Sequence, residues 1–163
     1  MTLFTVACAA LAFVAPVIQT SSPSASIDAV ERRLVGTWKL VKYEILDERG
    51  AARPGGFDAG RIMYGDSGEM TAHLLRTGGS TAAATTQATR AAAFQSYLGY
   101  FGPYTIDSSK HIVVHHVVGS SRPDWIGSEQ VRHYVLSEDG NQLTLSLKSG
   151  ERITQTLTWD RVR

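Results

Sequence analysis

Along most of the chain after residue 36, hydrophobic and polar residues alternate with a period of two, which is typical of strands with one buried face. The clearest run is QLTLSLK (142–148), where leucines alternate with small polar residues. Turn-forming sequences such as EDGN and SG separate the runs. The pattern predicts eight strands, at residues 37–46, 60–65, 69–76, 99–107, 111–119, 128–137, 142–148 and 152–160.

Short connections between consecutive strands make the neighbours antiparallel. Eight such strands close most readily into an up-and-down barrel, which leaves no open edge and can hold one small ligand. We therefore predict a mainly β fold, an eight-stranded antiparallel up-and-down barrel with one or two short helices, forming a single domain over residues 27–163. A β-sandwich is the alternative architecture.

Two segments depart from the alternation and predict helices. Residues 26–36 form a short helix in which Asp28 is the N-cap and Glu31 its capping-box partner, with Gly36 at the end. An Ala-rich segment predicts a second helix over residues 87–98, which we expect to cover a mouth of the barrel or to pack on its wall.

Strict alternation also assigns residues to faces. In the first strand, Trp38 and Tyr43 fall on opposite faces. In the last strand, Ile153 falls on the same face as Leu157 and Trp159.

The strand at 111–119 contains two adjacent histidines, His115 and His116, whose side chains must point to opposite faces. One of them therefore faces the interior of the barrel, and the alternation does not say which. Such a histidine titrates near neutral pH and can exchange protons with a ligand.

The next strand places Gln130, Arg132 and Tyr134 on one face and His133 on the other. If Gln130, Arg132 and Tyr134 point inward, they form a polar, positively charged part of the barrel wall beside a histidine. An inward Arg132 requires partners, which are either a ligand carboxylate or carbonyl, or backbone carbonyls with a carboxylate such as Glu129 or Asp124.

Aromatic side chains with a polar tip suit a pocket that grips and orients an apolar molecule. Core packing is the alternative for each of them. A lone strand histidine, His73, is a further candidate for the cavity, with a structural role as its alternative. The aromatic candidates for ligand binding are Tyr64, Tyr97, Tyr100, Tyr104 and Trp125.

The 163 residues carry 16 basic and 15 acidic side chains, for a formal charge of +1, and contain no run of Lys or Arg. This balance argues against a nucleic-acid-binding surface. His-x-His spacing, phosphate-binding glycine loops and nucleophile-elbow motifs do not occur in the sequence. We expect no metal and no cofactor, zinc and haem included.

The N-terminus has a different composition from the rest. An uncharged apolar block, LFTVACAALAFVAPVI (3–18), precedes the small polar residues QTSSPSAS (19–26). This order predicts a signal peptide and linker over residues 1–26, cleaved near Ala25 or Ser26, and hence a secreted or periplasmic protein that has no membrane attachment after processing. An uncleaved anchor or a disordered tail is the alternative. Processing would remove Cys8, the only cysteine, so the mature domain would have no disulfide.

LVGTWKLVKYE (34–44) resembles the opening of the calycins, in which a Gly-x-Trp begins the first strand. Gly36 and Trp38 supply that motif here. The resemblance implies that the Trp plugs the closed end of the barrel and that a basic residue of the last strand, Arg161 or Arg163, packs over it.

The chain is more specifically similar to the bacterial and fungal lipocalin-like domain proteins, over residues 34–160. The resemblance implies an eight-stranded lipocalin-like barrel and, because the family pattern retains an Arg in the segment SEQVRHY, an inward Arg132. It implies little about activity. The blocks that carry it are GRIMYGDSGEMTAHLLR, FQSYLGYFGPYTID and HHVVGSSRPDWIGSEQVRHYVLSEDGNQLTLS.

Two functions fit these observations. The first is binding of a small, mainly apolar or amphipathic molecule with a polar end inside the barrel, anchored by Arg132 and a histidine. The alternative is an enzyme in which His115 or His116, with Arg132, catalyses isomerisation, cyclisation or hydration of a ketone-like molecule. The oligomeric state does not follow from the sequence.

Overall fold

The fold is described from a computed structural model, which describes residues 29–78 and 86–163. The signal peptide predicted at 1–26 and the N-cap predicted at Asp28 lie outside the described residues. The helical elements are α1 (Ala29–Leu34), α2 (Gln87–Gln95) and the 3-10 turn η1 (Pro123–Trp125). The strands are β1 (Gly36–Leu46), β2 (Ala52–Pro54), β3 (Ala59–Tyr64), β4 (Glu69–Leu75), β5 (Tyr97–Asp107), β6 (Ile112–His116), β7 (Gly119–Ser120), β8 (Glu129–Leu136), β9 (Gln142–Ser149) and β10 (Arg152–Arg161).

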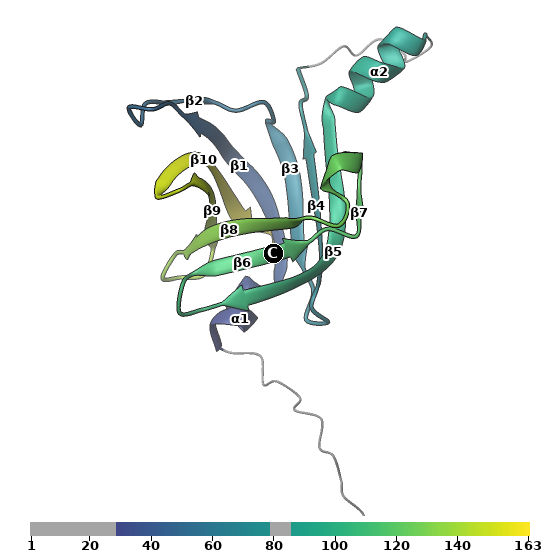
Figure 1. Cartoon of the computed structure of the whole chain (residues 1–163). Coiled ribbons are helices and arrows are strands. Elements are labelled where there is room, and N and C mark those ends of the chain that lie inside the picture. The colour runs from purple at the N-terminus through teal and green to yellow at the C-terminus, as the bar shows by residue number, and fades with distance from the viewer. Residues whose placement is uncertain (1–28, 79–85) are drawn as a thin grey trace, which may run out of the picture.

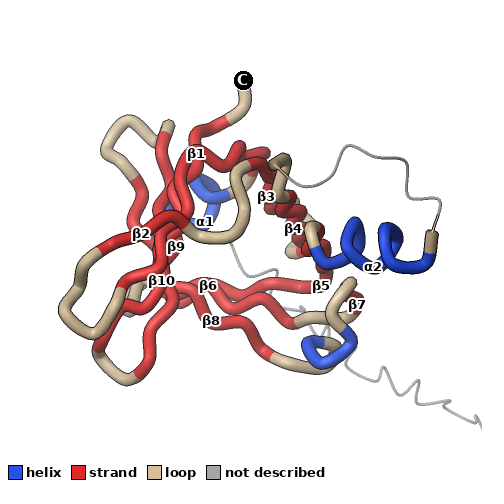
Figure 2. The backbone as a smooth tube through the Cα atoms, turned by 90° about the horizontal axis from the view of Figure 1, so that it is seen from above, coloured by secondary structure: helices blue, strands red, loops and turns tan. Residues whose placement is uncertain are grey.

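Eight of the strands form a closed antiparallel barrel, as the alternation predicts (Figure 1). The order runs β1-β3-β4-β5-β6-β8-β9-β10, and β10 returns to pair with β1. Seen from above, the strands surround one axis (Figure 2). The short strands β2 and β7 add to the rim by pairing with β1 and β5. The barrel prediction is therefore confirmed, and the sandwich alternative is wrong.

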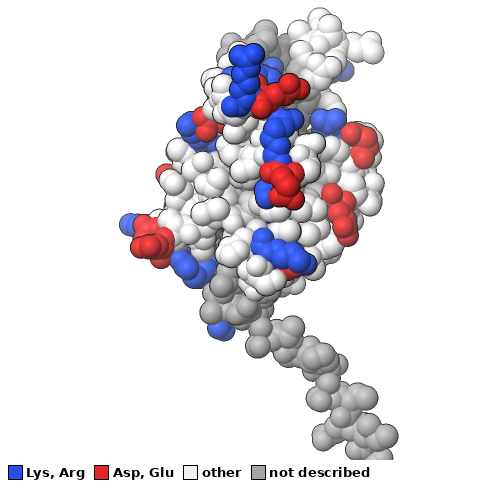
Figure 3. Space-filling model, turned by 60° about the vertical axis from the view of Figure 1, so that its left-hand side comes forward, with Lys and Arg blue, Asp and Glu red and all other residues white. Residues whose placement is uncertain are grey.

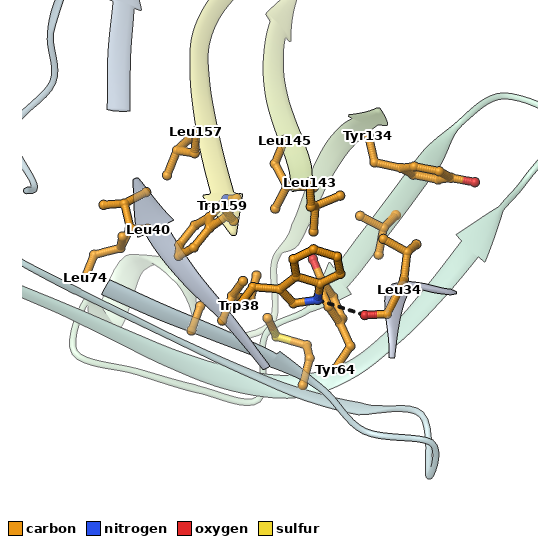
Figure 4. Packing of buried hydrophobic residues seen from close by; sticks show 14 of the residues in the cluster. Leu34, Trp38, Leu40, Tyr64, Leu74, Tyr134, Leu143, Leu145, Leu157 and Trp159 are labelled. Carbon is orange, nitrogen blue, oxygen red and sulfur yellow. Dashed lines mark hydrogen bonds between the residues drawn. The ribbon is translucent and has the colours of Figure 1, made fainter. Parts of the chain in front are cut away.

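One end of the barrel is closed around Trp38, as the calycin resemblance implies. The Trp38 ring is fully buried, and its Nε1–H donates to the Leu34 carbonyl at 2.9 Å (Figure 4). The guanidinium of Arg161 lies 4.1 Å from the centre of this ring. Arg161 also donates to the backbone carbonyls of Val35 at 2.9 Å, Gly140 at 2.8 Å and Arg33. The basic residue over the Trp is thus Arg161.

The Gly of the Gly-x-Trp motif leaves room for that arginine. Gly36 has a φ of +133°, a conformation that side chains rarely adopt. A Cβ at this position would lie 2.7 Å from Nη1 of Arg161. Glycine is therefore required both by the backbone conformation and by the close approach of the guanidinium.

Two β-bulges change the faces that strict alternation assigns. The register of β1 shifts between Leu40 and Lys42, so Tyr43 turns to the same inner side as Trp38. The register of β10 shifts between Ile153 and Gln155, so Ile153 loses the inward phase of Gln155, Leu157 and Trp159 and is exposed. The predicted faces of Tyr43 and Ile153 were wrong, because a bulge inserts one residue and reverses the alternation beyond it.

Helix α2 has the predicted position but not the predicted packing. Thr86 caps it through a capping box with Thr89, yet none of its residues is buried, and it projects beyond the end of β5 (Figure 1). Its apolar side chains are mainly alanines, which offer little area to bury against the barrel. Neither helix within residues 29–78 and 86–163 is long and apolar enough to cross a bilayer.

Candidate functional site

The barrel encloses a cavity of about 200 Å³ on the side of Trp159 away from the closed end, and the cavity is partly open to solvent. Its wall is mainly apolar, with leucines from β4, β5, β9 and β10. The polar groups in the wall are two arginines, two tyrosines and one glutamine. The lining residues are Tyr43, Phe57, Ile62, Ala72, Leu74, Leu98, Tyr100, Arg122, Trp125, Arg132, Leu145, Leu147, Gln155, Leu157 and Trp159.

Arg132 points into this cavity from β8 and is only 7 % exposed. Its Nη1 donates to the Val131 carbonyl at 2.9 Å, and its Nη2 donates to Oε1 of Gln130 at 3.2 Å. Gln130 is held in turn, because its Nε2 donates to the Ser128 hydroxyl at 2.9 Å. The neighbours on β8 therefore fix the guanidinium in place.

His115 lies inside the barrel between two tyrosines and is 1 % exposed. Its Nε2 is hydrogen-bonded to the Tyr64 hydroxyl at 2.8 Å, and its Nδ1 to the Tyr100 hydroxyl at 3.0 Å. A neutral imidazole has one donor and one acceptor nitrogen, so one tyrosine donates to the ring and the other accepts from it. Both ring nitrogens are therefore occupied, and of the three residues only Tyr100 lines the cavity.

Burial keeps this cluster uncharged apart from Arg132. Burial lowers the pKa of His115 well below 6.5, and the positive charge of Arg132 and the neighbouring His116 lower it further. Burial raises the pKa of Tyr64 well above 10, and Tyr100 raises it further. Burial also raises the pKa of Tyr100, which Arg132 partly offsets through its charge and a hydrogen bond. At neutral pH the imidazole and both phenols are therefore neutral.

The sequence model of a family described as "lipocalin-like domain" matches residues 35–162, nearly the whole barrel. The chain belongs to the lipocalin-like domain family. The resemblance seen in the sequence is confirmed, and a lipocalin-like barrel indicates small-molecule binding in general.

Among solved structures, the chain is similar to a redesigned β-barrel, with 12 % sequence identity and a TM-score of 0.42, over 81 % of this chain and 94 % of that one. A search of curated proteins finds no significant match.

The buried histidine predicts a pH-dependent stability. Each pH unit below 6.5 should lower the free energy of unfolding by about 1.4 kcal/mol for as long as folded His115 stays neutral. The reason is that the unfolded imidazole takes up a proton at its ordinary pKa and the buried one does not. Urea unfolding at about pH 7.5, 6.5 and 5.5 measures this slope.

His115→Leu is the matched control, because leucine takes up no proton in either state and the variant should lose this slope. Hydrogen bonds from Lys110 and Ser137 lower the pKa values of Asp107 and Asp139. Those carboxyls affect stability only at more acidic pH. A stability that is flat from pH 7.5 to about 5.5 would contradict a neutral buried His115.

Three predicted site residues lie on the outside of the barrel. His116 is hydrogen-bonded through Nε2 to the Thr105 hydroxyl at 3.0 Å, and its Nδ1 lies 3.3 Å from Glu129. His73 is hydrogen-bonded to the exposed Tyr97 hydroxyl at 2.5 Å. His116, His73 and Tyr97 therefore do not reach the cavity, because each has the opposite phase to the inward residues of its strand.

Four other predicted site residues point inward or are partly buried, but they do not line the cavity. Tyr64 holds His115, and Gln130 holds Arg132. The Tyr104 hydroxyl donates to the Gly65 carbonyl at 2.8 Å, and its ring packs edge-on against Tyr64. Tyr134 is buried in the core and its ring lies beside His111. The structure gives all four residues packing or supporting positions.

Tyr100, Trp125 and Arg132 are the predicted residues that the structure brings together in the cavity wall. Their role in ligand binding stays a prediction. The apolar wall and three polar residues, Tyr43, Arg122 and Gln155, were not predicted. The inward phases of β9 and β10 could have identified the leucines and Gln155, but the bulge in β1 conceals Tyr43, whose hydroxyl donates to Gln155 at 2.8 Å.

Within the described residues, no three His, Cys, Asp or Glu side chains group closely enough to hold a metal ion. The polar groups in the cavity wall are two guanidiniums, of which that of Arg132 is fixed, two phenols, two indoles and a carboxamide. These groups can bind and orient a polar end while the leucines contact an apolar body.

Proposed function

We propose that this protein binds a small, mainly apolar molecule inside the barrel, with the polar end of the molecule directed toward Arg132. The observation that carries the proposal is the apolar cavity of about 200 Å³ with a buried, inward guanidinium in its wall. An apolar cavity of roughly 150 Å³ in another protein holds benzene, so this one accommodates one ring or a short alkyl chain, with further atoms reaching toward the mouth.

Binding, and not catalysis by histidine, is the function that the geometry favours. The alternative enzyme needs a histidine that can exchange a proton with the ligand. His115 is inward, but two tyrosines occupy its ring nitrogens and it does not line the cavity. His116 faces outward. Neither His115 nor His116 is therefore placed to act directly on a molecule bound in this cavity.

Ala72→Phe tests the proposal by filling the cavity. Ala72 is buried in the wall on β4, so a phenyl group there would occupy the space that a ligand needs. We expect the parent protein to bind the neutral probe 3-phenylpropan-1-ol in isothermal titration calorimetry and the variant to lose at least about ten-fold in affinity, which is 1.4 kcal/mol. Thermal unfolding checks that the variant is folded.

Ala91→Phe is the matched control, because Ala91 is exposed on α2 and its replacement should leave binding unchanged. Native mass spectrometry of the protein purified from its own host gives an independent test, in which a bound small molecule should be present on the parent and missing from Ala72→Phe. Equal binding by the parent and Ala72→Phe would place the binding site outside the barrel and overturn the proposal.

A further inference from the structure

The charges around the cavity do not balance. Two arginines line it, and no Asp or Glu does. Arg122 is at the rim, where Nη2 lies 3.2 Å from a carboxylate oxygen of Asp124 and the guanidinium lies 5.5 Å from the Trp125 ring centre. Arg132 is the more deeply buried of the two, and among the described residues no carboxylate lies within ion-pair distance of it.

A buried cation without a counter-ion is unfavourable by several kcal/mol unless other groups stabilise it. Here the partners of Arg132 are neutral: the Val131 carbonyl, the Gln130 side chain and the Tyr100 hydroxyl. A guanidinium has five N–H donors, so these three acceptors leave about two of them without a protein acceptor in the described part of the chain.

Hydrogen bonds hold the Arg132 guanidinium in position without a ligand. Gln130 is held by Ser128, whose hydroxyl donates to the Trp125 carbonyl at 2.6 Å. Hydrogen bonds through Gln130 and Ser128 therefore link the Arg132 guanidinium to Trp125 at the rim of the cavity. A rigid fork with free donors matches the two oxygens of a carboxylate, which accept paired hydrogen bonds.

The outer surface does not offer a comparable site on the face shown in Figure 3, where basic and acidic side chains are interspersed. Arg132, by contrast, is a buried positive charge inside the barrel without an ion-pair partner in the described part of the chain. Because this charge adjoins the leucines of the cavity wall, its complement is an anion with an apolar body attached.

We infer that the molecule bound by the barrel is a small hydrophobic carboxylic acid, held as its anion by Arg132, with a body of about one aromatic ring or a short alkyl chain. This inference rests on the proposed function, and it adds the charge and the class of the ligand. A neutral ketone, alcohol or amide would leave the buried charge without a counter-ion.

The test compares two probes of the same shape, 3-phenylpropanoate and 3-phenylpropanamide, by isothermal titration calorimetry with the full chain near pH 7.5. The amide offers a carbonyl but no charge. We expect the acid to bind at least about ten-fold more tightly than the amide, the range of one charge-assisted hydrogen bond. Equal affinities would overturn the inference and leave the proposed function standing. Binding of neither probe, nor of 3-phenylpropan-1-ol, would overturn both.

Arg132→Gln should reduce the preference for the acid to less than about three-fold while the amide binds as before. Arg61→Gln is the matched control, and we expect it to keep the preference because Arg61 is exposed on β3 and does not line the cavity. If Arg132→Gln does not fold, the comparison of the two probes on the parent protein still decides the question. A preference that Arg122→Gln removes and Arg132→Gln keeps would assign the anion to the rim and overturn the inference.

Discussion

Replacing His115 with leucine should lower the free energy of unfolding by about 3 kcal/mol, although the side chains have similar volumes. Leucine cannot hydrogen-bond, so the variant leaves the hydroxyls of Tyr64 and Tyr100 without the ring nitrogens that they contact at 2.8 and 3.0 Å. The Tyr64 hydroxyl left unpaired costs about 1–3 kcal/mol, whereas the Tyr100 hydroxyl loses one hydrogen bond, worth about 1 kcal/mol, and keeps the one with Arg132. Urea unfolding at about pH 7.5 measures the loss.

Tyr64→Phe in the same chain should restore part of that loss. The Tyr64 hydroxyl is fully buried and its contact is with His115. In the double variant no unpaired hydroxyl remains at this position, so we expect it to be about 1–2 kcal/mol more stable than His115→Leu. Additive losses in the double-mutant cycle would show that the hydrogen bond contributes nothing to stability.

The strand pattern was sufficient to predict the barrel, because each strand buries one face and the turns are short. It was not sufficient to orient β6, since valines occupy both faces of that strand. Val113 and Val117 are buried beside His115, whereas Val118 is exposed on the face of His116. With apolar residues on both faces, only the pairing with β5 and β8 decides which histidine points inward.

Only part of the candidate site could be predicted. The reason is that the polarity of a residue does not show whether it lies on the inner face of a strand. His73 was a candidate on β4 as the polar residue, but the more apolar phase of Met70, Ala72 and Leu74 points inward. A small residue, Ala72, thus helps to form the cavity by leaving space. On β8, by contrast, the polar residue Arg132 points inward. The alternation of that strand did not show this, and the prediction depended on the family resemblance.

Replacing Trp38 with alanine should lower the free energy of unfolding by about 4 kcal/mol, within the range for large core aromatics. The variant loses the packing of a fully buried ring and its hydrogen bond to the Leu34 carbonyl. It also removes the ring beneath Arg161, a cation–π contact worth about 1 kcal/mol. Denaturant unfolding followed by circular dichroism measures the loss. Arg161→Met should lower the free energy of unfolding less in the Trp38→Ala variant than in the parent chain.

Trp125→Ala is the matched control at the other end of the barrel. Trp125 is half-buried in the cavity wall and packs edge-on against Tyr100, so its removal should lower stability by less than about 2 kcal/mol and should weaken binding of 3-phenylpropan-1-ol. Trp38 does not line the cavity, so the folded Trp38→Ala protein should keep its affinity for the probe. Equal effects of the two substitutions on stability and on binding would contradict the separation of a structural closed end from a ligand-binding cavity.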